Sequence, residues 1–132
     1  MGVRLDHIGI AVESLDDATA VYSSLLRVGA GEIRRERNEK EQVEIAFVDL
    51  PNCSIELLQP TAPTSTIAKY LSSQGEGIHH LCFVASDDLE EECKRLEASA
   101  FRIVGKEDGR HFFVHPKDCK GSLIEFYGKD HA

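Results

Sequence analysis

The chain has 132 residues, 42% of them hydrophobic and 29% charged, which is typical of one globular domain with a single core. Its formal net charge of −8 argues against broad binding of nucleic acids or anionic membranes, because either partner requires a basic face. No apolar run approaches the roughly 18 residues of a membrane helix, and the first residues lack the layout of a signal peptide. We therefore expect a cytoplasmic protein with no nucleic-acid and no membrane partner.

The first predicted element is a β-prone strand at residues 6–12, followed by a helix that Ser14 can cap. Apolar residues at helical spacing form the buried stripe of this helix: Leu15, Ala18, Tyr22, Leu25 and Leu26. The helix is expected to end near Gly29 and Gly31. Three further strands are predicted, at residues 31–37, 42–49 and 53–59. The first part of the chain therefore has the order βαβββ.

A linker at residues 61–76 contains a predicted short helix at 65–72, and the chain then repeats its plan. Residues 79–85 resemble the first strand. The next helix is expected to start at Asp87, with Glu90 three residues on, and to bury one stripe: Leu89, Cys93, Leu96 and Ala100. Three strands are predicted after it, at residues 102–104, 110–114 and 122–127.

This repeat predicts an α+β fold in a single domain, residues 1–132, made of two βαβββ modules at 1–60 and 77–132. The eight strands are expected to form an open, barrel-like sheet. Module alignment places His7 over His80 in the first strands and Glu56 over Glu125 in the last strands. A single histidine in a strand is more often a hydrogen-bonded structural residue than a metal ligand. The duplication, however, puts two imidazoles and two carboxylates at equivalent positions.

Burying these four groups without compensation would cost several kcal/mol, and a divalent cation would remove that cost. The ligand types suit Zn, Co, Ni, Mn or Fe(II), and an octahedral ion held this way keeps two positions open for substrate. The alternative is that both glutamates point outward on half-exposed strands. The neighbours two residues away from Glu56 and Glu125 are mostly core types, which favours the metal.

Other charged residues allow two further hypotheses. Glu44 is a carboxylate in an otherwise apolar strand, where it is either a surface residue or a base for proton abstraction. A basic group near the C-terminus is either solvated surface or a pocket for an anionic substrate: Lys106, Arg110, Lys117 and Lys120.

Five stretches carry a likeness to known proteins. They are Asp-His-Ile-Gly-Ile-Ala-Val at 6–12, Val-Glu-Ile at 43–45, Ile-Glu-Leu-Leu-Gln-Pro at 55–60, Gly-Ile-His-His-Leu at 77–81 and His-Pro-Lys-Asp-Cys-Lys-Gly-Ser-Leu-Ile-Glu at 115–125. At these stretches the chain resembles the vicinal-oxygen-chelate, or glyoxalase-like, superfamily, and within it the methylmalonyl-CoA epimerases. The last stretch is the most specific, and the likeness covers nearly the whole chain.

The resemblance implies one divalent metal ion, Co, Zn, Mn or Ni, with four ligands: His7, Glu56, His80 and Glu125. It implies epimerisation of methylmalonyl-CoA or a related 2-substituted acyl-CoA, in which Glu44 takes the C2 proton to form a metal-stabilised enolate. Glu125 is the candidate for returning a proton on the opposite face. Arg110, Lys117 and Lys120 are candidate contacts for the CoA phosphates. The family likeness also suggests a homodimer.

Three alternative functions remain open on this scaffold. One is a glyoxalase I-like isomerase or lyase that acts on a thiol adduct. The loop at residues 104–111 would shape the substrate pocket, and it is shorter here than is usual in the epimerases, which keeps this alternative open. Another is a ring-cleaving dioxygenase, which would hold Fe(II) with two histidines and one carboxylate. The third is a metal-free small-molecule or antibiotic binding module, which the four polar ligand candidates disfavour.

Overall fold

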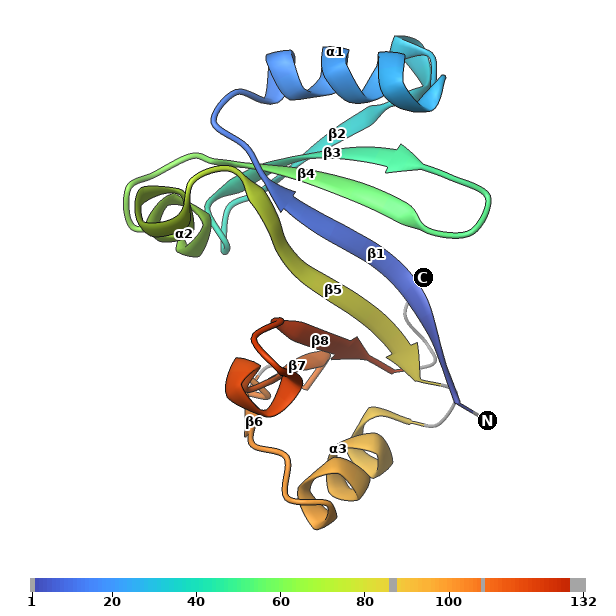
Figure 1. Ribbon diagram of the computed structural model, residues 1–132, viewed down its shortest axis with the longest axis vertical. Coiled ribbons are helices and arrows are strands. Elements are labelled where there is room, and N and C mark those ends of the chain that lie inside the picture. The colour runs from blue at the N-terminus through green and yellow to red at the C-terminus, as the bar shows by residue number, and fades with distance from the viewer. Residues whose placement is uncertain (1, 86–87, 108, 129–132) are drawn as a thin grey trace. The chain divides into compact units, whose positions relative to one another are not determined.

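The computed structural model describes residues 2–85, 88–107 and 109–128, with helices and strands in the predicted order (Figure 1). The strands are β1 (Val3–Ala11), β2 (Arg34–Asn38), β3 (Val43–Asp49), β4 (Ser54–Pro60), β5 (Gly77–Ala85), β6 (Ile103–Val104), β7 (His111–Val114) and β8 (Ile124–Tyr127). The helices are α1 (Leu15–Leu26), α2 (Thr66–Gln74), α3 (Leu89–Ala98) and the short 3-10 helices η1 (Ala30–Glu32) and η2 (Pro116–Cys119). Within the described ranges, no helix has the length and apolar character needed to cross a membrane.

The eight strands form a sheet in the order β2-β3-β4-β1-β5-β8-β7-β6, which confirms the predicted α+β class with an eight-stranded open sheet. The chain divides into two compact units. Residues 8–79 form one, called the α1 unit, and residues 1–7 with 80–132 form the other, called the α3 unit. His7 therefore belongs to the same unit as His80 and Glu125. The division into modules 1–60 and 77–132 stays a prediction.

Helix α1 packs against β3 and β4 in the α1 unit. Its N-cap is Ser14, whose hydroxyl accepts a hydrogen bond from Asp17 N at 3.2 Å, as the sequence predicts. The core of this region is apolar: Ile10, Val12, Leu15, Ala18, Ala46, Val48, Ile55 and Leu57. The prediction for Leu25 was wrong, since this side chain is 67% exposed. Leu26, the last residue of the predicted stripe, is partly buried against this core.

The segment after α1 also differs from its prediction. Arg27 ends the helix in the left-handed conformation, with φ 57°, two residues before Gly29, near which the helix was expected to end. Glu32 then accepts a hydrogen bond from Gly29 N at 3.0 Å, which closes the η1 turn. This local turn delays the start of β2 to Arg34, whereas a strand from residue 31 was predicted.

In the α3 unit, β5 and β8 run parallel, and β7 pairs antiparallel with both β8 and β6. The core of this unit is one apolar cluster: Ala85, Cys93, Leu96, Phe112, Val114 and Phe126. Helix α3 is capped by Asp88, which accepts a hydrogen bond from Glu91 N at 2.8 Å, while the predicted start at Asp87 lies outside the described residues. The helix ends at Ala98, so Ala100 is exposed and not part of the buried stripe.

The loop between β7 and β8 is held in place by one residue of η2. Asp118 accepts hydrogen bonds from the Arg102 guanidinium at 2.8 Å and from Arg102 N at 2.9 Å. These hydrogen bonds lower the pKa of Asp118 to about 2, so the carboxylate is ionised in neutral solution. The loop is therefore an anchored turn, and it carries Lys117 and Lys120 at the surface.

Candidate metal centre

Two histidines and one glutamate of the α3 unit converge on one point. His7 comes from β1, His80 from β5 and Glu125 from β8. The Nε2 atoms of His7 and His80 are 3.1 Å apart. Glu125 Oε1 lies 3.3 Å from His80 Nε2 and 3.8 Å from His7 Nε2. His7 and Glu125 are each only 5% exposed, so three of the four predicted ligands meet in a buried cluster.

The spacing of these atoms suits a divalent metal ion. Two nitrogens bound to one ion at about 2.1 Å lie about 3.0 Å apart at a right angle and about 3.4 Å apart at the tetrahedral angle. The 3.1 Å between the two imidazole nitrogens falls in this range. A cation would also offset the desolvation cost of burying the Glu125 carboxylate. The three residues therefore fit the ion that the sequence predicts.

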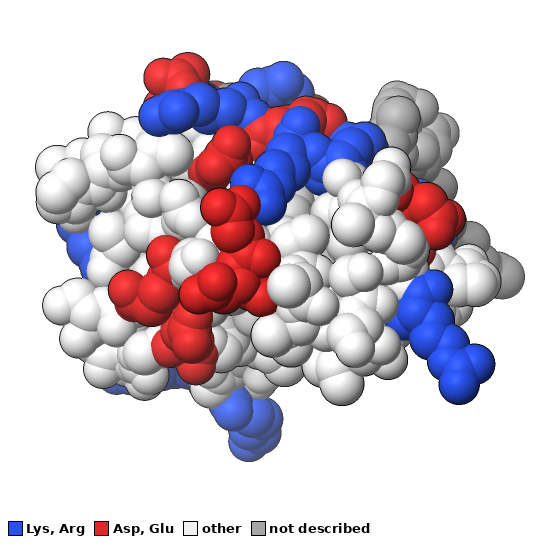
Figure 2. Space-filling view, turned by 90° about the horizontal axis from the view of Figure 1, so that it is seen from above, with Lys and Arg blue, Asp and Glu red and all other residues white. Residues whose placement is uncertain are grey.

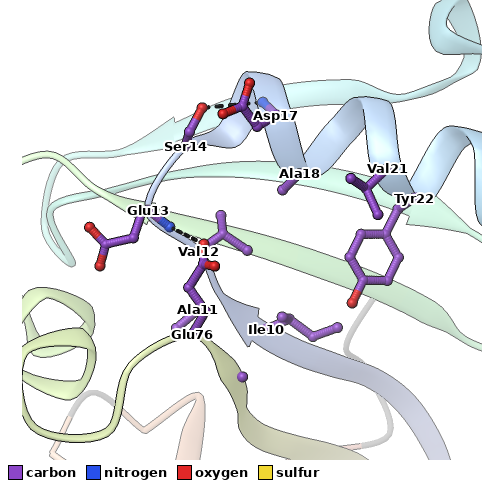
Figure 3. A pocket seen from close by; sticks show the side chains of 11 residues that line it. Ile10, Ala11, Val12, Glu13, Ser14, Asp17, Ala18, Val21, Tyr22 and Glu76 are labelled. Atoms are coloured by element: carbon purple, nitrogen blue, oxygen red, sulfur yellow. Dashed lines mark hydrogen bonds between the residues drawn. The ribbon is translucent and has the colours of Figure 1, made fainter.

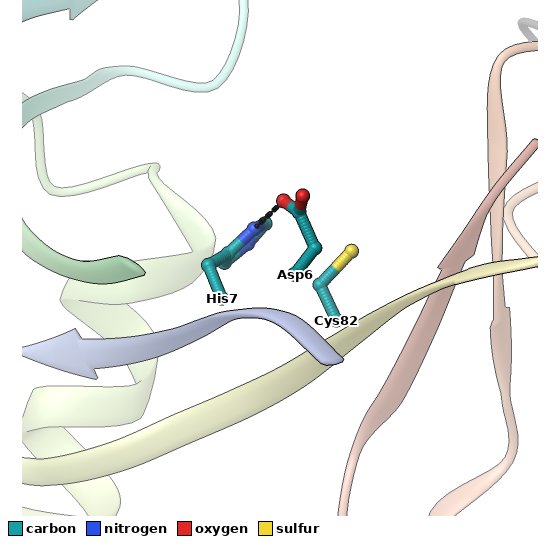
Figure 4. Close-up of side chains that lie close together, drawn as sticks. All are labelled: Asp6, His7 and Cys82. Carbon is teal, nitrogen blue, oxygen red and sulfur yellow. Dashed lines mark hydrogen bonds and ion pairs between the residues drawn. The ribbon is translucent and has the colours of Figure 1, made fainter. Parts of the chain in front are cut away.

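Asp6, which precedes His7 in the chain, orients the His7 ring (Figure 4). Asp6 Oδ2 lies 2.9 Å from His7 Nδ1, and Asp6 Oδ1 accepts a hydrogen bond from Arg4 Nη1 at 3.2 Å. In the neutral form of the His7 ring, a proton on Nδ1 can be donated to the Asp6 carboxylate, and this tautomer leaves the Nε2 lone pair for an ion. The buried thiol of Cys82 lies close to both residues. Sequence reasoning missed Asp6, although its position beside His7 is a usable signal.

His111 on β7 is a further polar residue of this cluster that sequence reasoning missed. Its Nδ1 lies 2.6 Å from Glu125 Oε2. Burial alone would raise the pKa of Glu125, but the hydrogen bond from His111 and the charges of the neighbouring histidines outweigh burial and lower that pKa. Glu125 is therefore ionised at neutral pH. The register of β7 on β8 pairs His111 with Tyr127, two residues from Glu125 on the same face, and this pairing leaves no signal in the sequence.

The other two predicted carboxylates lie on neighbouring strands of the α1 unit. Strands β3 and β4 pair antiparallel, with Glu44 opposite Gln59 and Glu56 opposite Phe47. Directly opposite residues share a face of a sheet, and consecutive residues alternate between faces. Glu56 therefore shares its face with Phe47 and Ile45, whereas Glu44 points to the other face.

The face that carries Glu44 is the one that α1 packs against. Gln59, its cross-strand partner, accepts a hydrogen bond from Leu15 N in the first turn of α1 at 2.6 Å. Ala46, two residues from Glu44, belongs to the core against α1. The hypothesis that Glu44 takes a proton beside a cation bound by Glu56 requires both carboxylates on one face. The register does not support that hypothesis, while Glu56 as the fourth ligand stays a prediction.

The predicted phosphate contacts lie at the surface of the α3 unit. Lys117 and Lys120 are exposed in the loop that contains η2. Arg110, also exposed, directly precedes β7 and thus His111. The three cations therefore flank the two ends of the strand that contributes His111 to the cluster.

A groove of about 520 Å³ lies in the α1 unit beside α1 and the end of β1 (Figure 3). Its apolar lining includes Ile10, Val12 and Ala18, and three carboxylates also line it: Glu13, Asp17 and Glu76. Figure 2 shows the largest group of acidic side chains near the middle of the face in view, with other acidic side chains toward its edges. Carboxylates at a groove repel phosphate groups, so this groove does not suit an anionic ligand.

Comparisons with known proteins add a consistent set of relatives. A sequence profile of the glyoxalase/bleomycin resistance protein/dioxygenase superfamily matches residues 6–115. The ethylmalonyl-CoA/methylmalonyl-CoA epimerase of Cereibacter sphaeroides is 38% identical over 130 residues, 92% of this chain and 95% of that protein. The crystal structure of methylmalonyl-CoA epimerase from Mycobacterium tuberculosis is 32% identical, with a TM-score of 0.80 over 95% of this chain and 87% of that one. A variant of the Streptomyces coelicolor methylmalonyl-CoA epimerase in complex with 2-nitronate-propionyl-CoA is 30% identical, with a TM-score of 0.83 over 98% and 96%.

Proposed function

Because the chain belongs to the glyoxalase/bleomycin resistance protein/dioxygenase superfamily, we propose that it is a metal-dependent epimerase of methylmalonyl-CoA or a related 2-substituted acyl-CoA. Its similarity to methylmalonyl-CoA epimerases identifies it as an enzyme of the isomerase class. The observation that carries the proposal is the convergence of His7, His80 and Glu125 in one buried cluster. A metal-free binding module has no need of such a cluster.

The proposed chemistry is proton exchange at C2, next to the thioester carbonyl. A divalent ion held by His7, His80 and Glu125 would supply positive charge that stabilises the enolate. Asp6 keeps His7 in the tautomer whose Nε2 can bind a cation. Glu125 is ionised and buried, so it can accept a proton away from bulk water. The proposal assigns one of the two proton transfers to Glu125.

The proposed acyl-CoA substrate is supported by the relatives and by the basic surface of the α3 unit. The structure of the Streptomyces coelicolor methylmalonyl-CoA epimerase variant is a complex with 2-nitronate-propionyl-CoA. In this chain Arg110, Lys117 and Lys120 would contact the CoA phosphates, because all three cations are exposed. The ion pair of Asp118 with Arg102 anchors the loop that carries Lys117 and Lys120. The homodimer expected from the sequence stays a prediction.

The proposal predicts metal-dependent hydrogen exchange at C2 of methylmalonyl-CoA. The measurement is deuterium incorporation in heavy water by mass spectrometry, corrected for spontaneous exchange. It compares the protein loaded with Co²⁺ and the same protein after chelation. We expect rapid exchange with the loaded protein and exchange at the spontaneous rate after chelation. Exchange that chelation leaves unchanged would contradict metal dependence, and no exchange by a metal-loaded protein would contradict the substrate.

Glu44→Gln is expected to retain exchange activity, because the β3–β4 register places Glu44 on the face that packs against α1. The change keeps the shape of the side chain and removes its charge. The measurement is the initial exchange rate at saturating Co²⁺, together with Co²⁺ affinity. A loss of about 100-fold or more in rate at unchanged affinity, the size typical of removing a general base, would return Glu44 to the mechanism.

A further inference from the structure

We infer that His111 is a positioning residue for Glu125, which it holds so that Oε1 alone is offered to a metal ion. The inference rests on the proposed metal centre and extends it to a residue outside the predicted ligand set. Its basis is that the two carboxylate oxygens have different surroundings. Oε2 lies 2.6 Å from His111 Nδ1, whereas Oε1 faces His80 Nε2 at 3.3 Å and His7 Nε2 at 3.8 Å.

The direction of the hydrogen bond follows from the charge of the acceptor. An ionised carboxylate has no proton to give, so Nδ1 of His111 carries the proton and donates it to Oε2. Hydrogen bonds to charged acceptors are short and strong, and the 2.6 Å separation is of that kind. With one oxygen committed to this donor, Glu125 can bind an ion in a monodentate way.

The His111 ring is itself held by its surroundings. It packs against the Phe113 ring at a centroid distance of 5.3 Å and against the Tyr127 ring at 5.3 Å. Its strand, β7, is paired on both sides, with β6 and with β8. The side chain is 19% exposed. A ring fixed in this way can transmit a defined orientation to Glu125.

Removing the donor should weaken metal binding and change its geometry. Hydrogen bonds from outer residues orient metal-bound carboxylates, and their loss typically lowers metal affinity about 10- to 100-fold. Without His111, the Glu125 carboxylate is free to rotate and to bind the ion through both oxygens. The number of ligands around the ion would then change, and the visible absorption bands of bound Co²⁺ report that number.

The experiment titrates Co²⁺ into the full chain and records both affinity and the absorption spectrum for wild type, His111→Leu, His111→Asn and His111→Gln. Leu removes the donor. Asn places an amide N–H where Nδ1 stands, and Gln places it where Nε2 stands. Circular dichroism and thermal unfolding check that each variant is folded. We expect Leu and Gln to lose affinity about 10- to 100-fold with an altered spectrum, and Asn to recover most of both.

Three outcomes would overturn the inference, and they are distinguishable. Wild-type affinity and spectrum in a folded His111→Leu protein would show that the ring does not position Glu125. Equal losses in Asn and Leu would show that the ring matters for packing and not as a donor at Nδ1. No Co²⁺ binding by the wild-type chain would instead remove the metal centre, and with it the proposed function, before any variant is compared.

Discussion

Replacing His80 by Ala is expected to abolish metal binding and leave the fold largely intact. The variant loses the nitrogen that lies 3.1 Å from His7 Nε2 and 3.3 Å from Glu125 Oε1. Loss of a direct ligand should exceed the about 10- to 100-fold effect of removing an outer hydrogen bond, so we expect a fall in Co²⁺ affinity of at least about 100-fold. His80 is not part of the apolar clusters that form the cores, so the unfolding temperature should change little. Isothermal titration calorimetry and thermal unfolding measure the two effects.

The matched control is His79→Ala, on the same strand. Side chains alternate along a strand, so His79 points away from the face of His80. The His79 ring instead packs edge-on against Tyr70, with centroids 5.0 Å apart. This variant should bind Co²⁺ with wild-type affinity. Full metal occupancy in His80→Ala, or equal losses in both variants, would contradict the assignment of His80 as a ligand.

Glu125→Gln is expected to lower the exchange rate by about 100- to 10,000-fold at saturating metal, the range typical of removing a general base. The substitution keeps the size of the side chain but removes the charge that the hydrogen bond from His111 and the neighbouring histidines stabilise. Because Gln still offers an oxygen, part of the metal affinity should survive. Measuring kcat at several Co²⁺ concentrations separates the lost base from the weakened ligand.

Glu90→Gln provides the control for that experiment. Glu90 also lies in the α3 unit, on α3, with its side chain 79% exposed and paired with Lys94 at 3.3 Å. Its neutralisation changes net charge by the same amount and should leave the exchange rate unchanged, since exposed pairs of this kind contribute little. A Glu125→Gln enzyme with wild-type kcat at saturating metal would remove Glu125 from proton transfer.

Much of the architecture could be predicted from the sequence, because it depends on local patterns. Apolar residues at periods of 2 and 3.6 distinguish strands from helices, and they predicted the strands and helices in the order observed. The internal repeat then aligned His7 with His80 and singled out Glu125, and these three side chains meet in the structure. Errors in the elements were confined to ends, such as Arg27 and Ala100, where side-chain capping and turns outweigh periodicity.

What only the tertiary structure decided is which face and which partner each polar side chain has. A one-residue difference in register moves a side chain to the opposite face, and pairing between β3 and β4 therefore decides that Glu44 faces α1 and not the side of Glu56. Likewise, His111 becomes a partner of Glu125 because β7 lies beside β8 in one particular register. The sequence by itself predicted the order of the strands and main helices, and three of its four ligand candidates meet in one cluster. Strand pairing decided the rest, because hydrogen bonds between distant segments leave no local periodic signal.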